Sequence, residues 1–200
     1  MTPWFIATKR FDSNDQGWAS YIEFSGLGQL TEVVSLDGLI CPSLPKEFKE
    51  EYRPYVVQED FLLHYFPDFD FLTAQIAGLE GMNVLCVFRN PVEQPTAPLG
   101  ASWEFIGFDL INKKDSVSAL TNCGGYPDVF ANAELTCFGL LPELKRANEV
   151  QNQLRKLYPE DPHADCYVFA IFRELSPILV TYKNFGTGRL PNVRSFVQYL

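Results

Sequence analysis

The chain has 200 residues, of which 46% are hydrophobic and 20% are charged, and its formal net charge at pH 7 is -9. This composition can fill a hydrophobic core, which excludes a disordered chain. The negative charge argues against nucleic-acid binding and against binding to an anionic membrane, because both need a basic surface. No apolar run is long enough for a membrane-spanning helix.

The five cysteines form no C-x-x-C pair. This pattern argues against a disulfide framework and against a zinc ribbon or finger. Cys86 and Cys166 lie in strand-like apolar runs, where we expect them to be small buried hydrophobes. Residues 1–11 lack the charge order and the cleavage site of a signal peptide. We therefore expect a reducing compartment, most simply the cytoplasm.

The first third of the chain is predicted to be a β-meander. Residues 4–11 are rich in residues that favour strands, and residues 18–24 and 30–36 alternate between two faces. Turn-forming Gly and Asp residues separate these three segments. Period-two patterns bounded by such residues are typical of strands and hairpins.

An amphipathic helix is predicted next, because apolar residues recur there at steps of three and four. They are Phe61, Tyr65, Phe69, Leu72, Ile76 and Leu79. Pro67 interrupts the pattern, which predicts a kink or a second helix that begins at Pro67. Asp68 and Asp70 would then occupy the first turn of that helix, where acids suit the helix dipole, and Gly78 would end it.

The rest of the chain carries five further predicted strands and one clear helix. The strands are residues 82–89, 103–111, 116–121, 166–175 and 178–183, and the helix is 142–158, with shorter ones expected at 128–139 and 193–200. The strands come in adjacent runs instead of alternating with helices. This order predicts a single α+β domain over residues 1–200, with a mainly antiparallel sheet of about eight strands and about three helices packed on it.

The sharpest local motif is a cysteine at a strand end, in Thr121-Asn122-Cys123-Gly124-Gly125. Exposed backbone N–H groups beside Cys123 could stabilise a thiolate or an oxyanion. His163 is available as a base and Asp165 as the residue that orients it, which is the arrangement of cysteine hydrolases. The alternative is that the glycines form a turn and that Cys123 is an inert, half-buried thiol.

Two other groups of residues carry weaker chemical signals. His64 with Asp68 and Asp70, and His163 with Asp165 and Cys166, are metal-type residues. A zinc site needs three or four converging ligands and the chain has two histidines, so we expect no metal and no cofactor.

Glu104 and Asp109 are candidate paired carboxylates on one strand. A regular strand places them on opposite faces, whereas a bulge at Gly107 would change that. The alternative is that they face solvent or form salt bridges with Arg89 or Arg173.

The segment from residue 59 to residue 80 holds five acids and no Lys or Arg. Phe66 and Phe71 fall off the apolar stripe, so exposed rings there would be anchors among the carboxylates of Glu59, Asp60, Asp68 and Asp70. Aromatic anchors with charged rims give protein interfaces their affinity and fast association. The alternative is a wide core face with acids at a helix start.

Two functions follow from these patterns. The first is a non-enzymatic acidic protein that masks or scaffolds a basic protein partner, as an inhibitor, an immunity-type protein or an adaptor. The second is a thiol-dependent hydrolase or transferase that uses Cys123 and His163. The sequence leaves the oligomeric state and any small-molecule ligand open.

Overall fold

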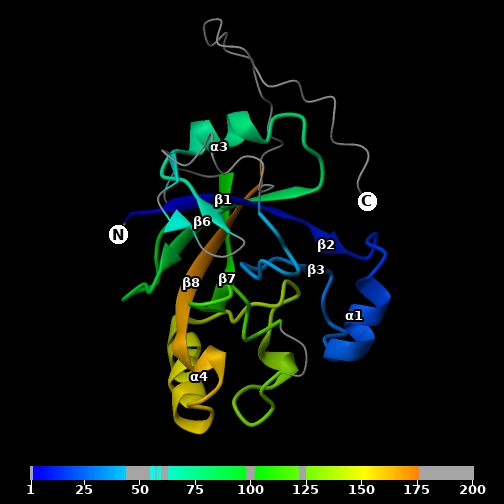
Figure 1. Ribbon diagram of the computed structural model, residues 1–200, viewed down its shortest axis with the longest axis vertical. Coiled ribbons are helices and arrows are strands. Elements are labelled where there is room, and N and C mark those ends of the chain that lie inside the picture. Colours follow the sequence, from blue (N-terminus) through cyan, green and yellow to red (C-terminus); the bar gives the residue numbers. More distant parts are fainter. Residues whose placement is uncertain are drawn as a thin grey trace, which may run out of the picture.

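The computed structural model describes residues 2–43, 55–56, 58–59, 63–97, 102–121 and 125–175. Its main sheet has four strands in the order β1-β6-β8-β7, and all neighbouring strands are antiparallel (Figure 1). These strands are β1 (Trp4–Lys9), β6 (Met82–Arg89), β7 (Trp103–Asn112) and β8 (Cys166–Glu174). Two small two-stranded sheets pair β2 (Phe11–Asp12) with β3 (Glu32–Val33), and β4 (Gln58–Glu59) with β5 (His64–Tyr65).

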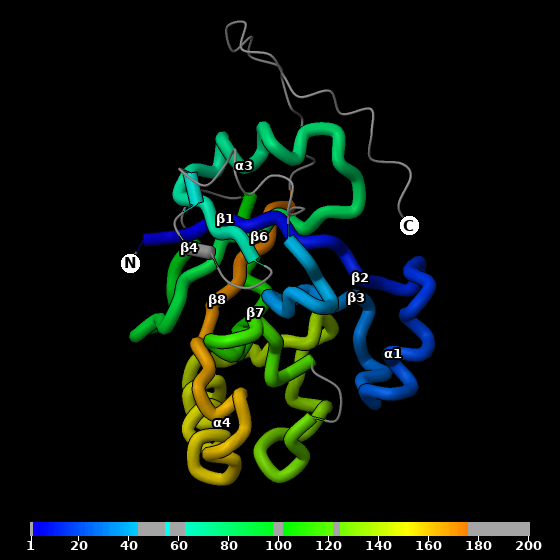
Figure 2. The backbone as a smooth tube through the Cα atoms, in the orientation of Figure 1, coloured from blue at the N-terminus to red at the C-terminus, as the bar shows by residue number. Residues whose placement is uncertain are grey.

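Within the described residues, three α-helices accompany the sheets: α1 (Trp18–Ser25), α3 (Phe69–Gln75) and α4 (Leu144–Leu157). Figure 2 shows α3 beyond the β1 end of the main sheet, α4 at the opposite end, and α1 to one side. The described residues also contain the short 3-10 helices η4 (Asn132–Glu134) and η5 (Pro162–Asp165). Three helices and a mainly antiparallel sheet fit the expected α+β class. The expected sheet of about eight strands is wrong, because the main sheet has four.

The main sheet is covered on both faces, which explains why its two central strands are apolar along their length. In β6, Val84, Cys86 and Phe88 belong to one buried cluster, whereas Leu85 and Val87 belong to a second. β8 divides its residues between the same two clusters in the same alternating way. Since successive strand residues point to opposite faces, each face of the sheet carries its own core.

The edge strand β7 contains a bulge at Gly107. The register with β8 shifts between Phe105 and Gly107, and Gly107 has a φ of 141°. A Cβ atom there would lie 2.6 Å from the Leu140 Cβ and 2.9 Å from the Leu141 carbonyl oxygen. Glycine is therefore required by both conformation and space.

The first segment predicted wrongly is residues 18–24, which form helix α1 and not a strand. Trp18, Tyr21, Ile22 and Ser25 are the half-buried residues of this segment, and they recur at helical steps. Gly26 ends the helix in the left-handed conformation, with its N–H donating to the Ile22 carbonyl at 3.0 Å. That C-terminal glycine is the helix signal in this stretch.

Several other predicted elements are shorter than expected or lie elsewhere. Residues 30–36 contain only the two-residue strand β3, and residues 128–139 contain only η4. In the predicted strand 116–121, Ser118 alone pairs, in an isolated bridge with Ile111. The predicted elements at 178–183 and 193–200 lie outside the described residues. Within the described part of the chain, no helix combines the length and the apolar character needed to span a membrane.

Candidate functional site

The predicted acidic, aromatic segment contains helix α3. The helix begins at Phe69, and Asp68 caps it by accepting a 2.8 Å hydrogen bond from the Phe71 N–H. The acids lie at the start of this helix as predicted, but the helix begins at Phe69 instead of Pro67, so Asp70 is in the first turn and Asp68 is the cap. The helix ends at Gln75, before the expected Gly78, and Tyr65 lies in strand β5 instead of the expected helix. A capping carboxylate satisfies a free N–H group and interacts favourably with the helix dipole.

One aromatic pair lies beside these acids. The rings of Tyr55 and Phe71 are stacked with centroids 4.4 Å apart, Tyr55 is 52% exposed, and Phe71 is half-buried. We call Tyr55, Asp68, Asp70 and Phe71 the α3 surface. An aromatic pair that is partly open to solvent supplies contact area at low entropic cost.

Phe66 does not belong to this surface, and its expected exposure is wrong. Its side chain is 1% exposed and lies in the main core. Phe66 is not helical, because its N–H and carbonyl both pair with the backbone of Phe5 at 2.8 Å. This pairing places residues 64–66 in an extended segment next to β1, which turns the Phe66 ring inward.

Asp68 and Asp70 are exposed, and neither forms an ion pair within the described residues. By contrast, the buried Glu32 accepts hydrogen bonds from both Arg10 and Arg173 at 3.0 Å. Of the other acids predicted for the surface, Glu59 is described only by its backbone in β4, and Asp60 lies outside the described residues. The negative potential of Asp68 and Asp70 is therefore not neutralised by neighbouring described side chains.

The second predicted site centres on His163, which is 6% exposed. Its Nδ1 lies 2.9 Å from Asp161 Oδ1 and 2.8 Å from the Tyr126 hydroxyl. Its Nε2 is buried and has no hydrogen-bond partner among the described residues. Cys123 lies outside the described residues.

Asp161, and not the predicted Asp165, orients His163. Asp165 carries an exposed carboxylate that pairs with the Lys113 ammonium group. Asp161 also accepts a 2.8 Å hydrogen bond from the His163 N–H, because Asp161, Pro162 and His163 form the start of η5. An Asp two residues before a histidine, with a proline between them, was the sequence signal for this contact.

The environment around His163 shifts the pKa values of Asp161 and Tyr126 in opposite directions. Burial opposes the ionisation of Asp161, but hydrogen bonds from His163 and Tyr126 hold the pKa of its carboxyl below the usual value. Burial and the hydrogen bond to the Asp161 carboxylate raise the pKa of the Tyr126 hydroxyl far above its usual value. Tyr126 is therefore a permanent donor to an ionised Asp161 at neutral pH.

A further polar centre, which the sequence did not reveal, is buried around Asp109. Its carboxylate accepts hydrogen bonds from the hydroxyls of Ser35 and Ser118 at 2.6 Å. It also accepts from the backbone N–H groups of Leu36 at 2.9 Å and Leu110 at 2.8 Å. Asp109 is fully buried, so burial raises the pKa of its carboxyl, while the hydrogen bonds from Ser118, Ser35 and Leu36 oppose that shift.

The predicted pairing of Asp109 with Glu104 is not observed. The bulge at Gly107 puts both residues on the same face of β7, as the sequence allowed. However, Glu104 is exposed and opposite Arg173 in the register, whereas Asp109 is enclosed by its own donors. This arrangement fits a structural role for Asp109.

The described cysteines are mostly buried thiols. Cys41, Cys86 and Cys166 are buried and Cys137 is exposed, all of them free. Burial raises the pKa of Cys86 and of Cys166 to about 12, so neither is a thiolate at neutral pH. The expectation that Cys86 and Cys166 are small buried hydrophobes is confirmed.

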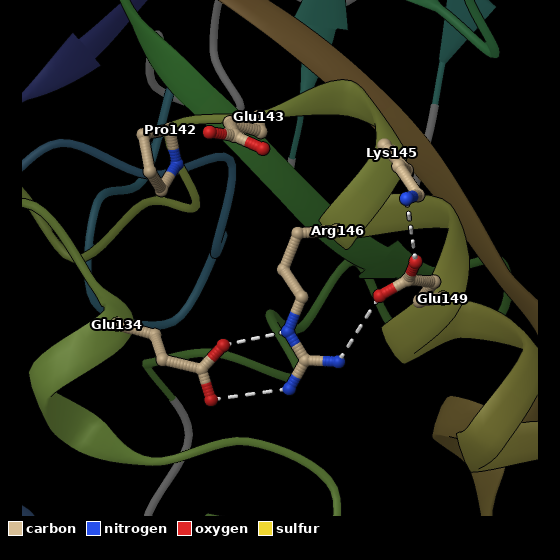
Figure 3. A pocket seen from close by; sticks show the side chains of 6 residues that line it. All are labelled: Glu134, Pro142, Glu143, Lys145, Arg146 and Glu149. Atoms are coloured by element: carbon tan, nitrogen blue, oxygen red, sulfur yellow. Dashed lines mark hydrogen bonds and ion pairs between the residues drawn. The ribbon is translucent and has the colours of Figure 1, made fainter.

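A shallow hollow of about 370 Å³ lies at the start of α4. Figure 3 shows Arg146 between two carboxylates there, with Glu134 on one side and Glu149 on the other. Arg146 donates to both Glu134 oxygens at 2.6 and 3.1 Å, and its third nitrogen lies 3.6 Å from Glu149. Since its cation is already paired, this hollow has the features of a structural ion-pair network.

The fold brings together some of the residues predicted for the acidic aromatic surface and for the site around His163. Asp68, Asp70 and Phe71 share the α3 surface, and His163 gains Asp161 and Tyr126 as partners. Among the described residues, no three His, Cys, Asp or Glu side chains come together as they would around a metal ion.

No known protein family, curated protein or solved structure matches this chain.

Proposed function

We propose that this protein binds a basic protein partner through the α3 surface and masks or scaffolds it without catalysing a reaction. The observation that carries the proposal is that two exposed carboxylates, Asp68 and Asp70, form no ion pair within the described residues and lie at the helix start beside Phe71, whose ring stacks on Tyr55. The net charge of -9 adds long-range attraction for a cationic molecule. An inhibitor, an immunity-type protein and an adaptor all use such a surface.

The two kinds of residue on the α3 surface have different roles in this proposal. Tyr55 and Phe71 supply apolar area that is buried on contact, which determines how long a complex lasts. Asp68 and Asp70 determine how fast the partner arrives, because unpaired surface charges steer association. The partner then presents Lys or Arg residues around an apolar or aromatic side chain.

Affinity capture from the native host with two matched double variants tests the proposal. Asp68→Asn with Asp70→Asn removes two charges and keeps the cap, since Asn is as good an N-cap as Asp. Glu93→Gln with Glu160→Gln removes two charges from exposed residues away from the α3 surface. We expect a basic protein identified by mass spectrometry to be captured by wild type and by the second variant, and much less by the first. Equal capture by all three proteins would overturn the proposal.

A second candidate function keeps Cys123 as a nucleophile. In hydrolases of this type, a carboxylate holds the Nδ1 of the histidine so that its Nε2 is left for the nucleophile. The observation that favours this candidate is the contact between Asp161 and His163 Nδ1, together with a His163 Nε2 that has no partner among the described residues. The burial of His163 limits access by a substrate, which is why binding ranks first.

Alkylation of Cys123 by iodoacetamide separates the two functions. If His163 is its base, Cys123 reacts rapidly below pH 7, and His163→Asn moves the midpoint of the reaction toward that of an ordinary thiol. Cys137→Ser provides the background for labelling, because Cys137 is the exposed cysteine of the described residues. A slow Cys123 that reacts only at high pH in both proteins would remove the catalytic candidate.

A further inference from the structure

Helix α1 presents an apolar side chain to solvent. Phe24 is 66% exposed, and no residue of α1 is buried. The half-buried residues Trp18, Tyr21 and Ile22 face the protein, whereas the opposite face consists of Ala19, Ser20, Glu23 and Phe24. We call these four residues the α1 face. Because helical side chains point back toward the preceding turn, we expect the Phe24 ring over the small Ser20.

The α1 face is rigidly supported although it is exposed. The Tyr21 hydroxyl donates to the Thr121 carbonyl at 2.9 Å, and the Asn132 amide donates to the Gly26 carbonyl at 3.1 Å. Phe11 packs edge-on against the rings of Trp18 and Tyr21, with centroids 5.4 Å away in each case. The helix that carries Phe24 is therefore anchored to the rest of the fold, which lowers the entropic cost of binding through its exposed face.

The stretch of sequence that contains α1 carries acids but no bases. Residues 11–45 contain no Lys or Arg. The two cations that precede this segment are already paired, Lys9 with Asp15 at 3.8 Å and Arg10 with Glu32 at 3.0 Å. Glu23 is exposed, lies next to Phe24 in the chain, and forms no ion pair within the described residues. The surface therefore combines an apolar ring with a carboxylate that no described cation neutralises.

We infer that the α1 face is a second docking surface, which binds a cationic amphipathic segment of a protein. An apolar side chain of that segment packs on Phe24, and a neighbouring Lys or Arg pairs with Glu23. Charge complementarity selects this occupant, because a second copy of the chain would bring another net charge of -9 to an already negative face. The inference is independent of the α3 surface, which lies apart from α1 in Figure 1.

The probe for this surface is a synthetic amphipathic helical peptide of Lys and Leu, with a second peptide that has Glu in place of every Lys. Titration followed by amide NMR shifts is expected to move the resonances of Ser20, Glu23 and Phe24 with the Lys peptide only. Phe24→Ala should weaken binding about fivefold or more, as loss of an interface anchor does. Glu23→Gln should lower the salt dependence of binding, and Val92→Ala, which truncates a residue that is 90% exposed elsewhere, should change nothing.

Four results would overturn the inference. They are equal shifts with the Glu peptide, unchanged affinity in Phe24→Ala, shifts confined to residues of α3, and sedimentation that shows self-association dependent on Phe24. Shifts confined to α3 would leave the proposed α3 surface standing while removing the α1 face. Shifts confined to α1 would support the α1 face and count against the α3 surface, so the two failures are distinguishable.

Discussion

The Ser118 hydroxyl lies 2.6 Å from the Asp109 carboxylate and donates its proton to it. The direction is set by the Leu120 N–H, which donates to Ser118 Oγ at 3.1 Å and so leaves the hydroxyl proton for Asp109. Ser35 Oγ is fixed in the same way by the Asp37 N–H at 2.9 Å. Each described hydrogen-bond partner of Asp109 is therefore a donor, and this buried centre ties residues 35–37 and 118–121 to strand β7.

Replacement of Asp109 tests this centre. Asp109→Asn places an amide NH₂ where an acceptor is required, so at least one buried donor loses its partner. We expect the free energy of unfolding at pH 7 to fall by about 1–3 kcal/mol, measured by urea denaturation. Glu104→Gln, on the exposed part of the same strand, should leave stability unchanged. An Asp109→Asn protein as stable as wild type would mean that the carboxyl is held as a neutral acid.

Glycine 107 provides a test of the bulge in β7. Gly107→Ala would force a Cβ into Leu140 at a φ of 141°. We expect a loss of about 1–3 kcal/mol in the free energy of unfolding, as for other overpacked sites. Gly28→Ala is the control, since a Cβ there meets nothing within 4 Å. Equal stability of the two variants would contradict the constraint described for the bulge.

The pairing of Glu134 with Arg146 should make stability depend on pH. The hydrogen bond from Arg146 holds the pKa of Glu134 below its ordinary value of 4.5. A carboxyl whose pKa is lowered on folding stabilises the protein above its unfolded-state pKa, and that stabilisation is lost as the pH falls through the lower, folded-state value. At pH 7 the free energy of unfolding of wild type should therefore exceed that of Glu134→Gln by less than about 1 kcal/mol. This difference in stability should vanish in acid.

Thermal unfolding of both proteins from pH 7 to pH 2 checks this dependence. Glu143→Gln is the matched variant, because Glu143 lines the same hollow without an ion pair in the described residues. A constant difference between wild type and Glu134→Gln across the whole range would show that the ion pair is not the cause.

Two substitutions of Asp68 distinguish the effect of the helix cap on stability from the effect of its charge. Asp68→Ala removes the acceptor for the Phe71 N–H and should lower the free energy of unfolding by about 1 kcal/mol. Asp68→Asn keeps an acceptor and should be close to wild type. Chemical denaturation distinguishes the two, and an equal loss in both variants would mean that the charge and not the cap stabilises the helix start.

The sequence predicts those elements whose pattern is local and repeated. Strands β6 and β8 are continuous apolar runs, and α4 carries an apolar stripe of which Ala147, Val150 and Leu154 are buried. Residues 18–24 were misassigned because an alternation of apolar residues outweighed the helix-ending Gly26. In a short segment, period two and period 3.6 overlap, and a terminal glycine then decides between them.

The candidate sites depended on contacts between distant residues, which no local pattern encodes. Phe66 is buried because it pairs with Phe5, far away in the chain. Asp109 looked like a surface acid because its partners Ser35 and Ser118 lie on other segments. The exposed acids of α3 were predictable, since helix capping is a local property, and so was their position beside an aromatic residue.

The rate of association with the captured partner, measured against salt concentration, tests the central claim most directly. If the α3 surface steers a basic protein, the rate for wild type falls steeply between low and physiological ionic strength. The Asp68→Asn, Asp70→Asn protein should bind more slowly at low salt and show a shallower slope, while the Glu93→Gln, Glu160→Gln protein should follow wild type. Identical slopes for the two double variants would contradict the claim.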